Sequence, residues 1–135
     1  MNLENKILLI TGIDEFIGLR AAELAIAQGM KVRGLQSSAD VNKTAQNLGI
    51  EIIVGKITDA KIAQKACQGV DIVLHNAEIA QEAGAIKEFR EVNVGGTVNM
   101  AKAAKNAGVK SFIHLSSVMV YGFNYADGIT ESGTL

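Results

Sequence analysis

The sequence predicts an α/β protein built on a doubly wound parallel sheet with helices on both faces. Short apolar runs alternate strictly with amphipathic stretches along the chain, a rhythm typical of successive strand–helix units. Gly29, Gly49, Gly69 and Gly108 each follow an amphipathic stretch and precede an apolar run, where glycine accepts the left-handed conformation that closes a helix. With right-handed crossovers, this alternation favours a parallel sheet between two helical layers, three αβα layers in all. The strand order that we expect is 3-2-1-4-5.

Five runs are expected to form the strands. The runs that begin at residues 7 and 70 are almost wholly apolar, as expected of strands covered by helices on both faces. The other three mix apolar and polar residues. The expected strands span residues 7–11, 31–36, 50–54, 70–75 and 109–116.

Four amphipathic stretches are expected to form helices, over residues 16–28, 40–48, from 59 onward, and 85–107. The inward face of the first helix is expected to hold Ile17, Ala21, Leu24 and Ala25. The fourth helix is the longest, and its apolar residues lie roughly in register. They are Ile86, Phe89, Val92, Gly96, Met100 and Ala103.

The length of 135 residues fits one domain, which we expect over residues 1–122, followed by a loop or mobile tail over 123–135. The net charge of −1 offers no basic field to nucleic acid, and no apolar run approaches the ~20 residues of a membrane span. No signal peptide is visible, so we expect a soluble cytoplasmic protein. Cys67 is the only cysteine, so neither an intrachain disulfide nor a cysteine-rich metal site is expected.

The stretch from Lys6 to Gly18 combines a strand, a glycine turn and a helix start, which together present backbone N–H groups to a phosphate. Gly12 permits the sharp turn, and Gly18 permits close packing of the helix on the sheet. Glu15 replaces the middle glycine of G-x-x-G-x-x-G and adds a negative charge. Two interpretations stay open. Either Asp14 and Glu15 only favour a helix N-terminus that has lost its ligand, or Glu15 points outward and the site still binds.

The ends of the second and fourth runs are candidates for further contacts with a dinucleotide. An Asp or Glu at the end of the second strand holds the ribose 2′-hydroxyl of NAD, whereas an Arg accommodates NADP. This chain has Gln36 and Ser37 there, which suit a hydroxyl or a phosphate and specify neither cofactor. After the fourth run, the segment His75-Asn76-Ala77 lets the backbone pass beneath a nicotinamide ribose. His75 itself is expected to close the strand by hydrogen bonding.

Two later motifs are more specific, Asn93-Val-Gly-Gly-Thr97 and Ser116-Ser-Val-Met-Val-Tyr-Gly122. With the glycine turn, with residues 55–59 and with 75–77, they closely resemble the extended short-chain dehydrogenase/reductases, the NAD-dependent epimerase/dehydratase family. Members of that family often act on nucleotide sugars. The resemblance runs from about residue 6 to 122 and implies a Rossmann-like domain that takes NAD or NADP.

The resemblance implies roles for the matching residues. Gly12 and Gly18 match the phosphate-loop glycines, and the backbone at Phe16 and Ile17 matches contacts to the diphosphate. Ala77 matches the loop under the cofactor.

Lys56 and Ile57 match an Asp–hydrophobic pair beside the adenine, with lysine in place of the Asp. Asn93 matches an active-site asparagine, and Ser117 matches the serine that hydrogen-bonds the reacting oxygen of the substrate. The expected cofactor-binding set is completed by Glu15, Gln36, Ser37, Asn76, Asn93 and Ser116.

The family's proton donor is a tyrosine in Tyr-x-x-x-Lys, and these residues contain no such motif. Tyr121 is followed four residues later by Tyr125, and Tyr125 by Ile129. A phenol works as a general acid or base when a nearby cation lowers its pKa. The sequence therefore predicts a domain that binds NAD(P) and is not catalytic alone. Two alternatives stay open: a non-enzymatic scaffold, sensor or interaction module, and an active enzyme completed by another chain.

The last predicted strand, over residues 109–116, would lie at an edge of the sheet. It carries Val109, Phe112, Ile113 and Leu115, and an unpaired edge this apolar invites another chain. We therefore expect a homodimer, formed through this edge or through packing of the long helix.

Overall fold

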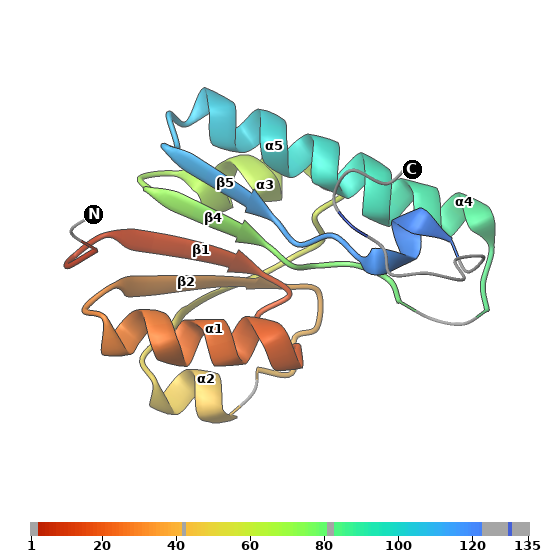
Figure 1. Cartoon of the computed structure of the whole chain (residues 1–135). Helices are drawn as coiled ribbons and strands as arrows, with labels where there is room; N and C mark the ends of the chain where they lie inside the picture. The colour runs from red at the N-terminus through yellow and green to blue at the C-terminus, as the bar shows by residue number, and fades with distance from the viewer. Residues whose placement is uncertain (1–2, 42, 81–82, 123–129, 131–135) are drawn as a thin grey trace.

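The strands of the structure are β1 (Ile7–Thr11), β2 (Lys31–Gln36), β3 (Glu51–Val54), β4 (Ile72–His75) and β5 (Ser111–His114). They form one parallel sheet in the order β3-β2-β1-β4-β5, which confirms the predicted order (Figure 1). The structure is a computed structural model and describes residues 3–41, 43–80, 83–122 and 130. The predicted tail over 123–135 lies outside the described residues, apart from Thr130.

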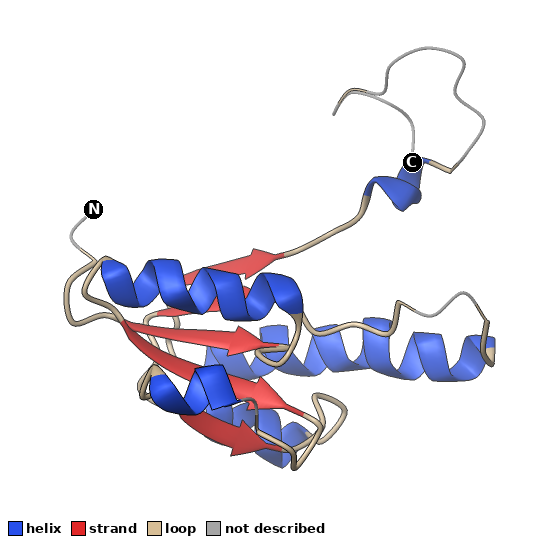
Figure 2. Ribbon diagram, turned by 90° about the horizontal axis from the view of Figure 1, so that it is seen from below, coloured by secondary structure: helices blue, strands red, loops and turns tan. Residues whose placement is uncertain are grey.

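Helices cover both faces of the sheet (Figures 1 and 2). On one face lie α1 (Phe16–Ala27) and α2 (Lys43–Asn47), and on the other α3 (Ala60–Cys67) and α5 (Thr97–Asn106). The side chains of β1 alternate between two cores, as the pleat of a strand requires. Leu8 and Ile10 pack with α1 and α2, whereas Leu9 packs with α3 and α5. The near-continuous apolar run of β1 is thus explained by burial on both faces.

α2 and β5 are each four residues shorter than predicted, and β4 begins at Ile72 rather than at residue 70. α2 begins at Lys43 rather than near Asp40, and side-chain hydrogen bonds hold residues 38–40 in a loop. The Gln36 amide donates to the carbonyl oxygens of Ser38 and Asp40 at 2.7 and 3.2 Å, and the Ser38 hydroxyl accepts from the Asp40 N–H at 3.1 Å. β5 covers only Ser111–His114 of the longer predicted run, which matches the length of its neighbour β4.

α1 is rotated relative to the predicted orientation. Ile17 and Leu24, both predicted to face inward, are 49% and 54% exposed. The reason is a close contact at Gly18, where a Cβ would lie 2.2 Å from the carbonyl oxygen of Gly12. This contact turns the small residues toward the sheet. The buried residues of α1 are Gly18, Ala22 and Ala25.

The predicted helix over residues 85–107 is helical along its length but not uniform. It consists of α4 (Ile86–Phe89), the π-helical segment η1 (Arg90–Gly96) and α5. A π turn contains more residues than an α turn, so residues before and after η1 do not share one face. Ile86, predicted to face inward, is exposed, whereas Met100 and Ala103 are buried as predicted.

Replacing Leu9 with Ala is expected to lower the free energy of unfolding by about 3 kcal/mol, because the fully buried side chain leaves a cavity. Replacing Leu24 with Ala should cost less than about 1 kcal/mol, because this leucine is half exposed. Urea unfolding followed by circular dichroism measures both values. Equal losses in the two variants would contradict the orientation of α1 described above.

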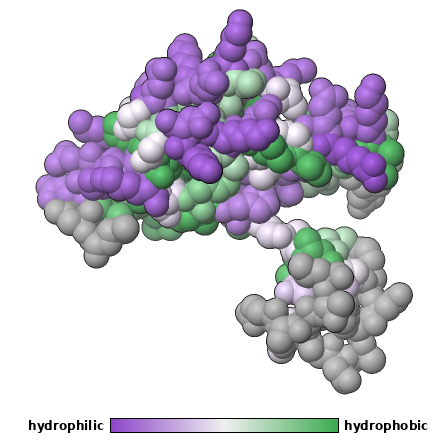
Figure 3. Space-filling view, turned by 90° about the horizontal axis from the view of Figure 1, so that it is seen from above, coloured by the Kyte–Doolittle hydropathy of each residue, from purple (hydrophilic) through white to green (hydrophobic). Residues whose placement is uncertain are grey.

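Association through the β5 edge remains a prediction. Ile113 and Leu115 are exposed beside this edge, whereas the face that carries α3 and α5 is mostly hydrophilic (Figure 3). A charge at Ile113 should therefore dissociate a dimer, as charged residues protect natural sheet edges. Light scattering coupled to gel filtration should show Ile113→Lys as a monomer, with Val98→Lys on the exposed side of α5 as the matched control. A wild-type monomer at tens of micromolar would rule the dimer out.

Candidate functional site

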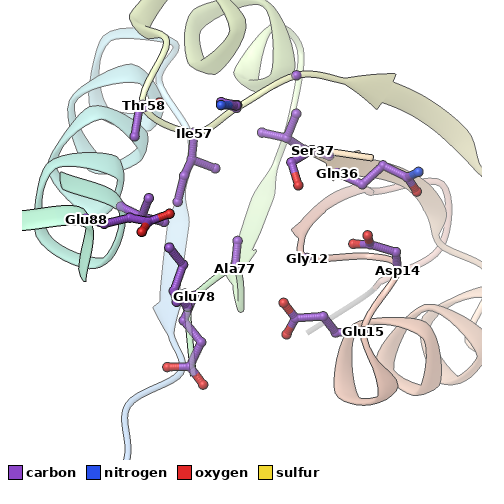
Figure 4. A pocket seen from close by; sticks show the side chains of 15 residues that line it. Gly12, Asp14, Glu15, Gln36, Ser37, Ile57, Thr58, Ala77, Glu78 and Glu88 are labelled. Carbon is purple, nitrogen blue, oxygen red and sulfur yellow. The ribbon is translucent and has the colours of Figure 1, made fainter. Parts of the chain in front are cut away.

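A cavity of about 290 Å³ lies at the carboxyl ends of the strands, where the strand order reverses between β1 and β4. Open α/β sheets bind ligands at such a point. Figure 4 shows the turn after β1 on one side, the β3–α3 loop on the other, and the loop after β4 between them. Its lining includes seven of the predicted cofactor-binding residues, which are Gly12, Glu15, Gln36, Ser37, Lys56, Ile57 and Ala77.

Two glycines close the turn after β1. Gly12 has a φ of +68°, and a Cβ there would lie 3.1 Å from the backbone of Ala77. Gly18 brings the first turn of α1 directly onto the carbonyl of Gly12. Phe16 and Ile17 begin α1 with exposed side chains, and N–H groups in a first turn have no partner within the helix. The N-terminus of α1 therefore lies beside the cavity in the arrangement that binds phosphate.

Thr11 joins the ends of β1 and β4. Its hydroxyl oxygen accepts hydrogen bonds from the backbone N–H groups of Asn76 at 3.1 Å and Ala77 at 3.0 Å. These two hydrogen bonds use both lone pairs of the hydroxyl oxygen. The contact with Nδ1 of His75, at 2.8 Å, is therefore one in which the Thr11 hydroxyl donates its proton. The loop that forms the middle of the cavity is thereby held to the central strand.

His75 continues this chain of hydrogen bonds into the helical layer. Because Nδ1 accepts, Nε2 of the neutral ring carries the proton and donates to Oγ1 of Thr97 at 2.9 Å. The Thr97 hydroxyl then donates to the carbonyl oxygen of Asn93 at 2.7 Å. Burial, and secondarily the charge of His114, lower the pKa of His75 to about 4. The prediction that His75 closes its strand through hydrogen bonds is confirmed.

Gln36 ends β2 with a nearly buried side chain, 2% exposed. Its Nε2 donates to two carbonyl oxygens of the β2–α2 loop, which sets the orientation of the amide. Its Oε1 is buried and has no hydrogen-bond partner within the described part of the chain. A buried acceptor without a donor costs about 1–3 kcal/mol, so a hydroxyl supplied by a ligand would be favourable at this point.

The loop between β3 and α3 forms the opposite wall of the cavity. Ile57 is buried there against Gly96 of η1, where a Cβ would lie 2.5 Å from Cδ1 of Ile57. The Asn99 side chain donates to the carbonyl oxygens of Ile57 and Thr58 at 3.3 and 2.9 Å. The π segment and α5 therefore set the backbone path of the loop that carries Lys56.

Carboxylates dominate the charge of the lining. Asp14, Glu15, Glu78 and Glu88 contribute to it, and Lys56 is the only cation among the described residues that line the cavity. The pKa of Glu15 is raised, first by desolvation and then by the negative charges of Asp14 and Glu78. A negative cavity is unusual for a ligand that carries phosphates, so the charge of the lining opposes the binding that its geometry favours.

The orientation of Glu15 differs from both interpretations of the sequence. Its side chain makes no cap hydrogen bond to α1, and it turns into the cavity rather than outward (Figure 4). The Asn76 amide donates to the Glu15 carboxylate at 3.4 Å and to the carbonyl oxygen of Gly12 at 3.3 Å. Asn76 thus stabilises the turn from the side of β4 and does not itself line the cavity.

Asn93 holds the loop after β4 from within η1. Its Oδ1 accepts from the N–H of Ile79 at 2.8 Å, and its Nδ2 donates to the carbonyl oxygen of Ile79 at 3.0 Å. Ile79 lines the cavity, whereas Asn93 does not. The described contacts of Asn93 are therefore those of a residue that positions the wall of the site, and its catalytic role stays a prediction.

Ser116 and Ser117 follow β5 and are not among the described residues that line the cavity. The Ser117 hydroxyl accepts from the N–H of Met119 at 3.2 Å, which caps the short 3-10 helix η2 (Val118–Tyr121). Figure 2 shows η2 standing apart from the sheet and its helices. The structure does not bring Ser116 or Ser117 to the cavity, and their roles stay predictions.

Thr11, Glu78 and Asn99 are among the residues of the site that were not predicted. Thr11 directly precedes Gly12 at the end of a strand, and this position was the signal in the sequence that could have identified it. Glu78 directly follows Ala77 and lies on the same loop. Asn99 carried no signal, because only the packing of α5 against the β3–α3 loop gives its side chain a partner.

Over residues 3–41, 43–80, 83–122 and 130, no group of three or more His, Cys, Asp or Glu side chains is placed to hold a metal ion. No helix in those ranges has the length and apolar character needed to cross a membrane.

Residues 8–134 match the model of the NAD dependent epimerase/dehydratase family. The chain belongs to this family. A curated relative is the 3 beta-hydroxysteroid dehydrogenase/Delta 5-->4-isomerase of Mycobacterium tuberculosis. It is 33% identical in an alignment of 129 residues that covers 89% of this chain and 34% of that protein. The chain spans about a third of the length of the curated relatives it matches.

Solved structures of family relatives agree with the fold. A short-chain dehydrogenase/reductase superfamily protein from Agrobacterium tumefaciens, with bound NAD, is 34% identical with a TM-score of 0.73 over 86% of this chain and 34% of its own. The dTDP-glucose 4,6-dehydratase DesIV of Streptomyces venezuelae, with NAD and TYD bound, is 29% identical. Its TM-score is 0.81 over 96% of this chain and 45% of its own.

The residues of this chain fit a dinucleotide at three points. The first is the tight turn that Gly12 and Gly18 permit, and the second is the N-terminus of α1, which this turn brings beside the cavity. The third is Oε1 of Gln36, which has no hydrogen-bond donor among the described residues. Glu15 is the residue that opposes the fit.

Acid is expected to destabilise the fold through His75, whose pKa is 6.5 ordinarily and about 4 in the folded chain. Between these values the unfolded chain binds the proton and the folded chain does not, so stability falls as pH drops from about 6.5 to about 4. The loss is on the order of 3 kcal/mol.

Urea unfolding between about pH 4.5 and 7 measures the slope of the unfolding free energy against pH. Carboxylates also contribute to this slope. His75→Gln should be less stable at neutral pH and show a shallower slope. His114→Gln should flatten the slope only in part, because the charge of His114 is the secondary cause of the lowered pKa of His75. An unchanged slope in His75→Gln would contradict the claim that the ring of His75 is buried and neutral in the folded protein.

Proposed function

We propose that this chain binds NAD, with the diphosphate at the N-terminus of α1 and the adenosine between the ends of β2 and β3. The observation that carries the proposal is the cavity at the reversal of strand order, lined jointly by Gly12, Gln36 and Ala77. Membership of an NAD-dependent family supports the same ligand.

Gln36 favours NAD over NADP. Its Oε1 is an acceptor that has no partner among the residues that the structure describes. The 2′-hydroxyl of NAD can donate to it, whereas the acceptor-only 2′-phosphate of NADP cannot. Arg33 is not free to bind that phosphate, because Glu51 and the carbonyl oxygens of Ala66 and Gln68 hold its guanidinium at 2.7–2.9 Å. The carboxylates of the lining disfavour the extra charge further.

When bound, the nicotinamide of NAD supplies a hydride acceptor. These residues contain no Tyr-x-x-x-Lys, so we propose that they contribute cofactor binding and not the proton transfer of family chemistry. Asn93 would position the loop beside the nicotinamide half through its two hydrogen bonds to Ile79. Ser117 stays a candidate for contact with the reacting oxygen of a substrate.

A second candidate is a non-enzymatic scaffold, sensor or interaction module. The Glu15 carboxylate favours it, because this group stands in the cavity beside the turn that would hold the diphosphate. Binding measurements separate the two candidates directly.

Fluorescence titration with NADH and NADPH should show NADPH binding weaker by at least about tenfold, or ~1.4 kcal/mol. Gln36→Arg should reverse the preference, because it replaces the buried acceptor with a cation that suits a phosphate. Gln46→Arg is the matched control, since it adds the same charge on α2 outside the cavity lining.

The control should keep the wild-type preference. Equal affinities for the two cofactors in wild type would contradict the assignment of Gln36. Absence of binding at millimolar concentrations of either dinucleotide would favour the second candidate.

A further inference from the structure

Glu15 stands where the turn after β1 meets α1, and its carboxylate is directed into the cavity (Figure 4). The backbone there is extended, with φ −87° and ψ 160°, so the residue fits the turn without strain. Within the described residues, its side chain makes no cap hydrogen bond to α1 and instead accepts from Nδ2 of Asn76 at 3.4 Å. Asn76 therefore holds the carboxylate in the cavity, and rotation into solvent would lose this contact.

Negative charge surrounds Glu15 from several elements. Asp14 precedes it in the same turn, Glu78 lies on the loop after β4, and Glu88 lines the cavity from α4. Desolvation raises the pKa of Glu15, and Asp14 and Glu78 raise it further. Even without a ligand, this carboxyl is therefore protonated more readily in the folded protein than a glutamate exposed to water.

The positive groups of the surrounding elements do not offset this charge. Lys56 lines the cavity from the loop between β3 and α3. Arg20, one turn further along α1, is paired with Glu23 at 2.6 Å. His75, at the end of β4, is buried and neutral because its pKa is lowered to about 4. The amide of Asn76 supplies only a neutral donor.

A dinucleotide brings its diphosphate to the N-terminus of α1, beside this carboxylate. Like charges that share a partly desolvated site raise the pKa of the weaker acid. A diphosphate diester is a strong acid that stays ionised, so the weaker acid of the two is the glutamate.

We propose that Glu15 takes up one proton from solvent when a dinucleotide binds, so that its carboxyl donates a hydrogen bond to the diphosphate. The inference rests on the proposed function and adds control by pH to the same site. The proton moves from buffer to the carboxylate, and no other bond is made or broken.

The sign of the pH dependence follows from the proton balance. The complex carries more protons than the free protein, so a lower pH favours binding and a higher pH opposes it. For a single proton, affinity falls by at most about tenfold per pH unit.

Isothermal titration of the chain with NAD⁺ at about pH 5.5, 6.5 and 7.5 tests the proposal. Buffers of different ionisation enthalpy report the protons taken up on binding. Glu15→Gln keeps the size of the side chain and removes its charge, so it should bind NAD⁺ more tightly at high pH, without proton uptake. Asp14→Asn is the matched control, because it removes an equal charge from the same turn and should retain the uptake.

A wild-type affinity independent of pH, or proton uptake that persists in Glu15→Gln, would overturn the proposal. Loss of the uptake in Asp14→Asn as well would assign it to the charge of the whole turn and also overturn it. If wild type and Glu15→Gln are folded by circular dichroism and neither binds NAD⁺ at millimolar concentration, the proposed function itself fails.

Discussion

The hydroxyl group of Thr11 makes three hydrogen bonds at the end of the central strand. It accepts from the N–H groups of Asn76 and Ala77 and donates to His75, which continues through Thr97 to the π segment η1. Each side chain in this series of hydrogen bonds has one proton to donate. Once Thr11 donates to His75, His75 must donate to Thr97. The end of β1, the loop after β4 and the long helix are thereby held together around the cavity.

The other walls of the cavity are held in the same way, by amide side chains bound to loop backbone. Gln36 binds two carbonyl oxygens of the β2–α2 loop, Asn99 binds two of the β3–α3 loop, and Asn93 binds both backbone groups of Ile79. Loops at the carboxyl edge of a parallel sheet leave their own strands and need such partners. The shape of the site is therefore determined by side chains that do not all line it.

Geometry and charge disagree at the turn after β1. Gly12 and Gly18 keep the turn tight and bring the N-terminus of α1 beside the cavity, which suits a phosphate, while Glu15 places a carboxylate there. Whether such a site accepts an anion depends on the protonation of one side chain rather than on a rearrangement of the backbone. In this turn, the glycines determine the backbone fold, whereas the protonation of Glu15 determines how strongly an anion binds.

The sequence by itself determined the parallel sheet with helices on both faces, because strict alternation and the helix-closing glycines are local signals. The expected strand order agrees with the structure, although the same alternation is compatible with other doubly wound orders. It also located the segments of the site, since their motifs lie at strand ends. Tertiary structure alone decided how individual side chains point. Ile17 and Leu24 lie outward because Gly18 must contact Gly12, and this contact joins two elements rather than following from periodicity. The inward turn of Glu15 depends likewise on Asn76, which lies far along the chain and comes close only when β1 and β4 pair.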